Sequence, residues 1–408
     1  MRNLLLMLMF SCVCAFADAS VLGIFEDTNF PAGIVGERDG VHRLEIIDNE
    51  LYAATEKGIF KYSESSNTWS LWALENVNVM DFKANGDEIV AIIVPQDTKG
   101  FRAVELARII RFSRNESEWE DITSAGMGYN FYDQAITYVM RLAQHPSEPH
   151  KLMVVAYPGI WVSEDFGTSW QSKTDCIYTY NEHQFLGWHP ANNDVIFYTT
   201  ENDAFATEIQ RSGNGGQDWD IINPDANGDN SCHCLAFDPE NPNHILYSGE
   251  GCIFESDDCG ISWHCVYRQD YHNQESPIGY AYNIMYDRSN NNILYAVILY
   301  AVGCSSDGYI HIFTSSDNGK TWRRIVKSDK FYDKEYWIFE SVILNGKLYI
   351  YTRKGVLTYS LDNNSGIRNI MTGNNNVAEM LYDLWGRRVI APQTGTIYMR
   401  GGKKIIAN

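Results

Sequence analysis

The sequence predicts an all-β protein, a seven-bladed β-propeller followed by a short C-terminal β tail. Two repeating features predict the ring. Tryptophans recur at positions 69, 119, 170, 219, 263 and 322, which lie 50, 51, 49, 44 and 59 residues apart. Seven polar turns recur at similar intervals, and each is followed by an apolar strand pattern. A period near fifty residues with about four short strands per period is typical of propeller blades.

An eight-residue motif ends at four of these tryptophans. Its copies are residues 163–170, 256–263 and 315–322, with Asn for Asp in residues 212–219. The carboxylate at the third position can accept backbone N–H groups across a tight turn, the glycine permits positive φ, and the tryptophan starts the next strand. We therefore expect the motif to hold a hairpin, with structural roles for Asp165, Trp170, Asn214, Trp219, Asp258, Trp263, Asp317 and Trp322.

These motifs resemble the Asp-box, or BNR repeat, of sialidase-like β-propellers, and residues 62–69 and 112–119 are weaker copies. The resemblance implies the fold. Asp-box families include sialidases, propeller glucanases acting on xyloglucan, sortilin-type receptors and photosystem assembly factors, so the function stays open. A sialidase is disfavoured, because no early Phe/Tyr-Arg-Ile-Pro motif and no arginine triad for a sugar carboxylate is evident. The arginines available for the ligand face are Arg38, Arg43, Arg102, Arg268 and Arg353.

The polar turns count the blades and show how the ring closes. They fall at residues 48–50, 85–87, 145–150, 189–194, 238–244, 287–292 and 345–346, which predicts seven blades. The seventh repeat ends near Ser360 without a box or a tryptophan, so its outer strand is missing. The apolar residues 21–25 precede the first repeat, and we expect them to supply that strand and remove an exposed sheet edge.

The N-terminus has the pattern of a secretory signal peptide. Arg2 precedes an apolar run at residues 4–10, and Ala15-Phe16-Ala17 forms a cleavage site before Asp18. The alternative is a lipoprotein modified at Cys12. No later apolar run is long enough to span a bilayer, so we expect an exported chain, soluble or surface-attached, in the periplasm, at the cell surface or secreted.

The net charge limits the classes of ligand that we expect, and the cysteine content limits the disulfides and metal sites. The formal net charge of −20 argues against nucleic acid and anionic membranes as ligands. Of nine cysteines, Cys12 and Cys14 leave with the signal peptide, and the remaining odd number leaves one thiol unpaired within the chain. We expect one or two disulfides among residues 232–265. The Cys-x-Cys pair lacks the usual zinc-ligand spacing, so the sequence predicts no metal and no cofactor.

Composition divides the chain into a signal peptide (1–17), the propeller (18–362), a linker rich in Asn, Ser, Gly and Thr (363–379), and a tail (380–408). The tail holds Tyr382-Asp383-Leu384, Gly386-Arg387, Gly395 and Gly402-Lys403-Lys404. It resembles the C-terminal module of exported Bacteroidetes proteins, which implies contact with the type IX secretion machinery as a sorting signal. The alternative is a small stabilising hairpin.

The crossover segments between blades are where we expect a ligand, because ring folds usually bind over their central channel. Residues 129–134, 178–184, 268–275 and 331–337 combine aromatic rings with carboxylates and amides, a composition that suits a polyhydroxylated ligand. The candidate ligand-binding residues are Tyr129, Tyr132, Tyr178, Tyr180, His183, Arg268, Tyr271, His272, Tyr332, Tyr336 and Trp337. The alternative is that these tyrosines only pack between blades.

Three functions remain at this stage. The first is an exported, monomeric propeller that binds a glycan or protein ligand without catalysis. The second is a glycoside hydrolase, sialidase-like or xyloglucanase-like, which needs two carboxylates about 5 to 9.5 Å apart. Its candidate catalytic residues are Asp133, Glu182, Asp270, Glu275, Asp333 and Glu335. The third is an assembly or scaffold factor.

Overall fold

The computed structural model consists almost entirely of β-strands. It describes residues 24–31, 42–95, 105–116, 118–131, 134–174, 185–201, 207–224, 234–249, 252–268, 280–287, 293–301, 307–329, 331–332, 338–361, 381–382, 388–389, 397–400 and 403–406. The chain divides into two compact units, one of residues 1–344 and 349–359 and the other of residues 345–348 and 360–408. In the described part of the chain, no helix is long and apolar enough to cross a membrane.

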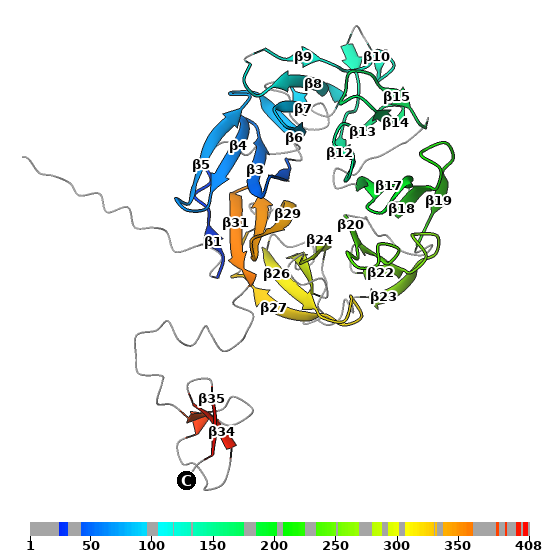
Figure 1. Cartoon of the computed structure of the whole chain (residues 1–408). Helices are drawn as coiled ribbons and strands as arrows, with labels where there is room; N and C mark the ends of the chain where they lie inside the picture. The colour runs from blue at the N-terminus through cyan, green and yellow to red at the C-terminus, as the bar shows by residue number, and fades with distance from the viewer. Residues whose placement is uncertain are drawn as a thin grey trace, which may run out of the picture. The chain divides into compact units, whose positions relative to one another are not determined.

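Seven sheets form a ring, which confirms the predicted fold (Figure 1). Blades 1 to 3 contain β2 (Leu44–Ile47), β3 (Glu50–Thr55), β4 (Gly58–Ser63) and β5 (Thr68–Ala73), then β6 (Asn78–Asn85), β7 (Glu88–Val94), β8 (Arg108–Ser113) and β9 (Glu120–Asp121), then β12 (Arg141–Gln144), β13 (Leu152–Ala156), β14 (Gly159–Ser163) and β15 (Gln171–Ser172). Each sheet is antiparallel and follows chain order from the ring axis outward.

The other four blades repeat this order. They contain β16 (Leu186–His189), β17 (Asn192–Glu201), β18 (Thr207–Ser212) and β19 (Asp220–Ile222), then β20 (Cys234–Phe237), β21 (Ile245–Gly249), β22 (Cys252–Ser256) and β23 (His264–Arg268), then β24 (Tyr280–Tyr286), β25 (Leu294–Ala301), β26 (Asp307–Ser315) and β27 (Arg323–Lys327), and finally β29 (Ile338–Leu344), β30 (Lys347–Thr352) and β31 (Gly355–Ser360). The first strands lie side by side, with β2 against β6 and β29 and β6 against β12.

Turns join the first and second strands of blades 1 to 5 and of blade 7 at the predicted places, whereas residues 288–292, which hold most of the predicted turn of blade 6, lie outside the described residues. In blade 1, Asp48 and Asn49 both have positive φ (50° and 62°), and in blade 7 so do Asn345 and Gly346 (51° and 71°). Two consecutive residues of positive φ match the right-handed twist of the flanking strands, which is why Asn, Asp and Gly occupy these hairpins. Local turn chemistry therefore sets the register of the blades.

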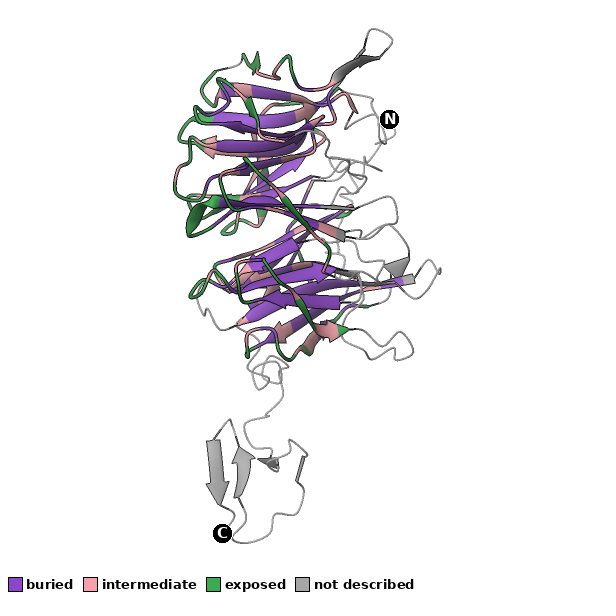
Figure 2. Ribbon diagram, turned by 90° about the vertical axis from the view of Figure 1, so that its right-hand side faces the viewer, coloured by how far each residue is buried: buried purple, intermediate pink, exposed green. Residues whose placement is uncertain are grey.

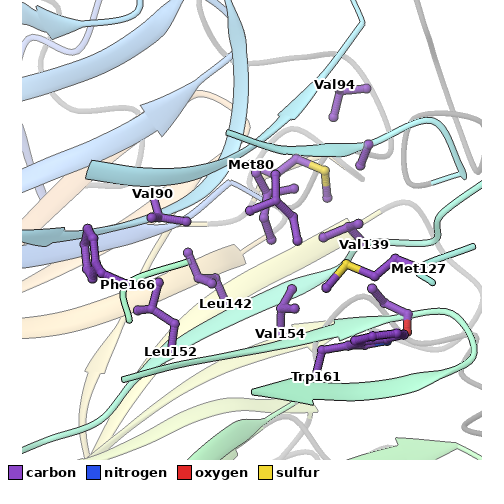
Figure 3. Packing of buried hydrophobic residues seen from close by; sticks show 14 residues of the cluster. Met80, Val90, Val94, Met127, Val139, Leu142, Leu152, Val154, Trp161 and Phe166 are labelled. Carbon is purple, nitrogen blue, oxygen red and sulfur yellow. The ribbon is translucent and has the colours of Figure 1, made fainter. Parts of the chain in front are cut away.

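Hydrophobic layers fill the spaces between neighbouring blades. Between blades 2 and 3, Met80 and Val90 pack against Leu142 and Val154, and Phe166 from a box turn joins the same cluster (Figure 3). Similar clusters lie between blades 7 and 1, 1 and 2, 3 and 4, 4 and 5, and 5 and 6. Strands such as β13 and β21 are therefore buried on both faces, whereas exposed residues gather on the outermost strands and at the turns (Figure 2).

An N-terminal strand closes the ring, as expected, but from residues a little later than predicted. β1 (Glu26–Asp27) pairs with β31, with Glu26 opposite Thr358. Phe25 is buried beside Tyr359, and the Thr28 hydroxyl donates to the Val356 carbonyl at 2.6 Å. Residues 21–23 lie outside the described residues. The apolar run alone misplaced the strand, because an outermost strand can carry exposed charged residues such as Glu26 and Asp27.

Three elements lie beyond the seven blades. A hairpin of β10 (Tyr129–Phe131) and β11 (Gln134–Ile136) stands in the crossover from blade 2 to blade 3. The short strand β28 (Phe331–Tyr332) follows blade 6 and pairs with β26. In the second unit, β33 (Arg388–Val389), β32 (Leu381–Tyr382), β34 (Ile397–Arg400) and β35 (Lys403–Ile406) form a four-stranded sheet in that order.

The expected disulfides are not formed at two of the described cysteines. Cys259 and Cys265 carry free thiols. Cys265 lies on the exposed outer strand of blade 5, where its thiol donates to the Tyr267 carbonyl at 3.3 Å, and Cys259 occupies the box turn with a φ of 62°. In this hairpin the turn residue Cys259 and the outer-strand residue Cys265 therefore carry thiols as ordinary side chains. Cys176, Cys232 and Cys304 lie outside the described residues.

Candidate functional site

The four boxes share one hydrogen-bond pattern, which blade 5 illustrates. The Ser256 hydroxyl donates to Asp258 Oδ1 at 2.8 Å and accepts the Gly260 backbone N–H at 2.8 Å. Asp258 also accepts the backbone N–H of Ser262 at 2.8 Å and its hydroxyl at 2.6 Å. Trp263 Nε1 donates to the Gly260 carbonyl at 3.1 Å. The polar groups of the box are therefore used within its own turn.

The same bonds recur in the other boxes. Asp165 accepts the Ser169 N–H at 2.8 Å, Asn214 the Asp218 N–H at 2.9 Å, and Asp317 the Thr321 N–H at 2.8 Å. Trp219 and Trp322 also donate to their box glycines, whereas Trp170 packs against the cluster between blades 2 and 3.

The box carboxylates are exposed, and the buried member of the box is the serine, such as Ser315 at 2% exposure. Burial would raise the pKa of the Asp258 carboxyl, but hydrogen bonds from Ser262 and Ser256 outweigh it and lower this pKa to about 2. The pKa values of Asp165 and Asp317 are lowered for the same reason, against the opposing effect of burial. A carboxylate saturated by its own turn is a poor general acid and a poor ligand.

Most of the crossover candidates lie outside the described residues. This holds for all six candidate catalytic carboxylates, Asp133, Glu182, Asp270, Glu275, Asp333 and Glu335, and for Tyr132, Tyr178, Tyr180, His183, Tyr271, His272, Tyr336 and Trp337. Of the remaining three, Tyr129 lies on β10 and Tyr332 on β28. Arg268 ends β23, and its guanidinium lies 6.0 Å from the centre of the Phe254 ring.

Charged side chains on the first strands of four blades form a group that the sequence did not predict. We call it the axial charge cluster, and it consists of Arg43, Glu45, Asp81, Lys83, Arg141 and Glu340. Arg43 Nη1 lies 3.3 Å from Glu340 Oε2, and Arg141 Nη1 lies 3.9 Å from the same oxygen. These residues come from blades 1, 7 and 3. Because blades 3 and 7 are not neighbours, the cluster reaches across the ring axis.

Backbone groups and further ion pairs complete the cluster. Asp81 accepts the backbone N–H of Phe82 at 2.9 Å and that of Leu142, in blade 3, at 3.0 Å. Lys83 Nζ contacts Glu45 directly and lies 3.8 Å from Asp81 Oδ1. Its three cations and three anions balance, so burying them requires no net charge in the ring.

Burial and mutual interactions set the protonation of the cluster. Burial, together with Arg141, lowers the pKa of the Arg43 guanidinium to about 10, so it remains charged at neutral pH. Burial raises the pKa of the Glu45 carboxyl, although Lys83 opposes the shift. Burial would lower the pKa of the Lys83 ammonium, but Glu45 and Asp81 outweigh it and raise this pKa. The contacts of Arg43, Arg141 and Lys83 with the three carboxylates therefore link the members of the cluster along the ring axis.

Two members of the axial charge cluster, Arg43 and Arg141, lie at the crossover ends of their strands, whereas Lys83 lies nearer the opposite end of β6. Arg43 directly precedes β2 and Arg141 is the first residue of β12, and a first strand begins where a crossover ends. Strands such as Leu44–Ile47 and Asn78–Asn85 alternate charged and apolar residues, a pattern that the sequence alone cannot distinguish from a solvent face. The signal that could have revealed it is charge at matched positions of several innermost strands.

Comparisons with known proteins agree with the geometry. The model of the BNR-Asp box repeat matches residues 160–173, which hold the box of blade 3. No curated protein matches the chain. The chain therefore carries the BNR-Asp box repeat in a seven-bladed propeller.

Several solved structures are similar in fold. The GH74 xyloglucanase from Xanthomonas campestris is 13% identical over 83% of this chain and 53% of that chain, with a TM-score of 0.56. YCF48 from Cyanidioschyzon merolae is 12% identical over 84% of this chain and 100% of that chain, with a TM-score of 0.54. YCF48 bound to D1 peptide is 13% identical over 80% and 99%, with a TM-score of 0.50. The chain spans about half the length of the xyloglucanase, and at these identities the likeness concerns the fold alone.

Proposed function

We propose that this protein is an exported β-propeller that binds a glycan or protein ligand on its crossover face. The proposal rests on two places where the chain adds strands to the repeated four-stranded blade. The hairpin β10–β11 and the strand β28 are added within crossovers, and they belong to the Tyr-rich segments at residues 129–134 and 331–337. Four-stranded blades do not need these additions to form a ring, so they are available for a ligand.

Two further observations favour this face. The box turns on the opposite face satisfy their own polar groups, as Asp258 and Ser256 do, so they have little to offer a ligand. The axial charge cluster places Arg43 and Arg141 near the crossover ends of the first strands. A partly exposed, charged lining together with Tyr-rich crossover segments suits a ligand with hydroxyl or amide groups.

The fold neighbours keep both ligand classes open. A propeller of similar fold is described as bound to a peptide, and another is a xyloglucanase. The second candidate function is therefore glycoside hydrolysis by two of the crossover carboxylates. In that case, changing one of Asp133, Glu182, Asp270, Glu275, Asp333 or Glu335 to the amide abolishes turnover and leaves affinity nearly unchanged.

A binding screen with matched variants tests the primary proposal. The purified mature chain is screened on a glycan array and a peptide library, and hits are assayed with Tyr180→Ala, Tyr271→Ala and Trp337→Ala. We expect each variant to weaken binding by about 0.5 to 1.5 kcal/mol through lost ring contacts. Trp119→Ala is the control, because this tryptophan is 48% exposed on the outer part of blade 2. Equal affinities for all four variants and the wild type would refute the crossover site.

Export and processing belong to the same proposal. The N-terminal pattern before Asp18 supports removal of a signal peptide, and the tail beyond residue 380 supports recognition by the type IX secretion machinery. N-terminal sequencing of the exported protein is expected to begin at Asp18. Retention of residues 1–17, or unchanged export after deletion of residues 380–408, would count against the respective part. We propose that the exported chain is a monomer, which sedimentation can test.

A further inference from the structure

Four side chains capable of binding a metal converge at the outer part of blade 5, away from the crossover candidates. We call them the blade-5 cluster: His244, Glu255, Asp257 and His264. His264 Nε2 lies 2.6 Å from Glu255 Oε1, and His244 Nε2 lies 3.3 Å from Glu255 Oε2 and 4.0 Å from Asp257 Oδ1. One donor atom each from Glu255, Asp257 and His264 lies within 4.8 Å of the others.

Two side chains of the blade-5 cluster are buried and two are exposed to solvent. The side chains of His244 and Glu255 are 6% and 9% exposed, whereas those of Asp257 and His264 are 71% and 58% exposed. An ion can therefore arrive from solvent, while two of its ligands are held by the fold. The exposed Asp257 and His264 can adjust their rotamers without disturbing the core.

Other side chains hold His244 from behind. Its Nδ1 lies 3.3 Å from the Tyr286 hydroxyl and 3.2 Å from Asn318 Nδ2. Asn318 Nδ2 can only donate, so in this arrangement Nδ1 accepts its N–H and the proton on Nε2 faces Glu255 Oε2. The Tyr286 hydroxyl donates to Asn318 Oδ1 at 2.6 Å, so its oxygen is free to accept a proton from Nδ1–H in the other tautomer. Binding of an ion at Nε2 requires the proton to move to Nδ1, beside the Tyr286 oxygen, and the Nε2 lone pair is then directed at the carboxylates. A hydrogen bond to the second ring nitrogen is the usual means by which proteins orient a metal-binding histidine.

The other blades show what the same positions carry when they serve the fold alone. In blade 2, the positions of His244 and Asp257 hold Asp87 and Arg114, which form an ion pair at 2.7 Å. In blade 3 they hold Lys151 and Glu164, paired at 3.1 Å.

The positions of Glu255 and His264 face each other across β22 and β23. In blade 4 the corresponding residues are Arg211 and Asp220, which face each other across β18 and β19. In blade 6 they are Thr314 and Arg323. A fold role is thus met by opposite charges or neutral groups, whereas blade 5 places two imidazoles beside the carboxylates of Glu255 and Asp257.

From this substitution we propose that the blade-5 cluster binds one divalent transition-metal ion, with Zn²⁺ as the expected ion. Two imidazoles and two carboxylates are a common zinc ligand set, and donor atoms around tetrahedral zinc lie roughly 3.3 Å apart, within the range of 2.6 to 4.0 Å that the contacts of this cluster span. Imidazole nitrogens select zinc over Mg²⁺ and Ca²⁺, which prefer oxygen ligands alone. The ion would neutralise the two carboxylates. The site is independent of the crossover ligand, because its residues belong to the box hairpin and the turn before β21.

The test uses the full mature chain without a histidine tag, stripped with EDTA and dialysed. Zn²⁺ is titrated by calorimetry, and Tm is followed with Zn²⁺ or Ca²⁺. We expect one Zn²⁺ per chain and a Tm that rises with Zn²⁺ concentration, because an ion that binds only the folded state stabilises it. We expect no such rise with Ca²⁺.

Two variants and one control decide the assignment. His264→Ala removes an exposed ligand and Glu255→Gln removes a central charge while keeping its shape, and each is expected to weaken Zn²⁺ binding by more than about 10- to 100-fold, the loss typical of supporting groups alone. His150→Ala removes an exposed histidine from the corresponding turn of blade 3 and should bind as the wild type does. Absence of saturable Zn²⁺ binding, unchanged binding in both variants, an equal effect of Ca²⁺, or loss in His150→Ala would overturn the proposal.

Discussion

The hydroxyl of Thr28 offers a test of how the ring is closed. It is fully buried, donates to the Val356 carbonyl at 2.6 Å in blade 7, and accepts Trp69 Nε1–H at 3.0 Å from blade 1. One side chain thus joins the first and last blades through the N-terminal segment. Thr28→Val keeps the shape of the side chain and removes only the hydroxyl.

The expected loss of stability depends on which hydrogen-bonding groups Thr28→Val leaves without a partner. The Val356 carbonyl keeps the backbone N–H of Thr28 at 3.3 Å, whereas the buried Trp69 Nε1–H loses the partner it has in this bond. An unsatisfied buried donor costs about 1 to 3 kcal/mol, so the free energy of unfolding should fall by that amount. Urea unfolding followed by tryptophan fluorescence is expected to show a lower midpoint with an unchanged slope.

A matched control and a double-mutant cycle make this prediction refutable. Thr68→Val changes an exposed threonine of β5 and should stay within about 0.5 kcal/mol of the wild type. Trp69→Phe removes the same hydrogen bond from the other side, so the double variant Thr28→Val/Trp69→Phe should cost less than the two single variants added together. If Thr28→Val unfolds like Thr68→Val, or the costs are additive, Thr28 does not link the blades as described.

Three further predictions concern the boxes and the axial charge cluster. Ser315→Ala should lower the free energy of unfolding by about 1 to 3 kcal/mol, because the buried Gly319 N–H loses its acceptor. Asp317→Ala should lower it by less, because Asp317 is exposed. A larger loss for Asp317→Ala than for Ser315→Ala in urea unfolding would contradict this prediction. The pKa of Asp258 is near 2 in the folded state and about 3.9 in the unfolded state, so its stabilising contribution is complete above about pH 3.9 and disappears as the pH falls toward 2. Asp258→Asn should therefore flatten the dependence of stability on pH in this range. An unchanged pH dependence would refute the assignment. Glu340→Ala should lower the free energy of unfolding by about 3 kcal/mol, because Arg43 and Arg141 lose a shared counter-charge. The expected shift in Tm is several degrees, so a Tm within roughly 1 °C of the wild type would show that the cluster contributes little.

The blade count was predictable because the repeat is local. The box glycines and the turns at Asp48-Asn49 and Asn345-Gly346 need particular residue types for their positive φ, so the chain itself marks where each hairpin bends. The closing strand was predicted in kind but placed about five residues early, since its position depends on long-range pairing between Asp27 and Leu357. No short pattern encodes that register.

The two charged clusters could not be predicted, because their members are distant in sequence. Arg43 and Glu340 meet only when the ring closes, and their distance depends on which strands lie innermost. His244 and His264 approach one another through the pairing of β21, β22 and β23, with Glu255 opposite both Leu246 and His264. The crossover candidates stay a prediction, because most of them lie outside the described residues.

A propeller contains its own reference for separating the needs of the fold from those of a site. Seven blades solve one packing problem, so a residue that packing requires should recur, as the box Ser–Asp–Gly–Trp set does in blades 3, 5 and 6. A residue that one blade alone carries at a matched position answers a different requirement. The two imidazoles of His244 and His264, where other blades place Lys151 or Asp220, meet this criterion. Because a cross-strand ion pair would serve the fold equally well there, stability alone gives no reason for two histidines.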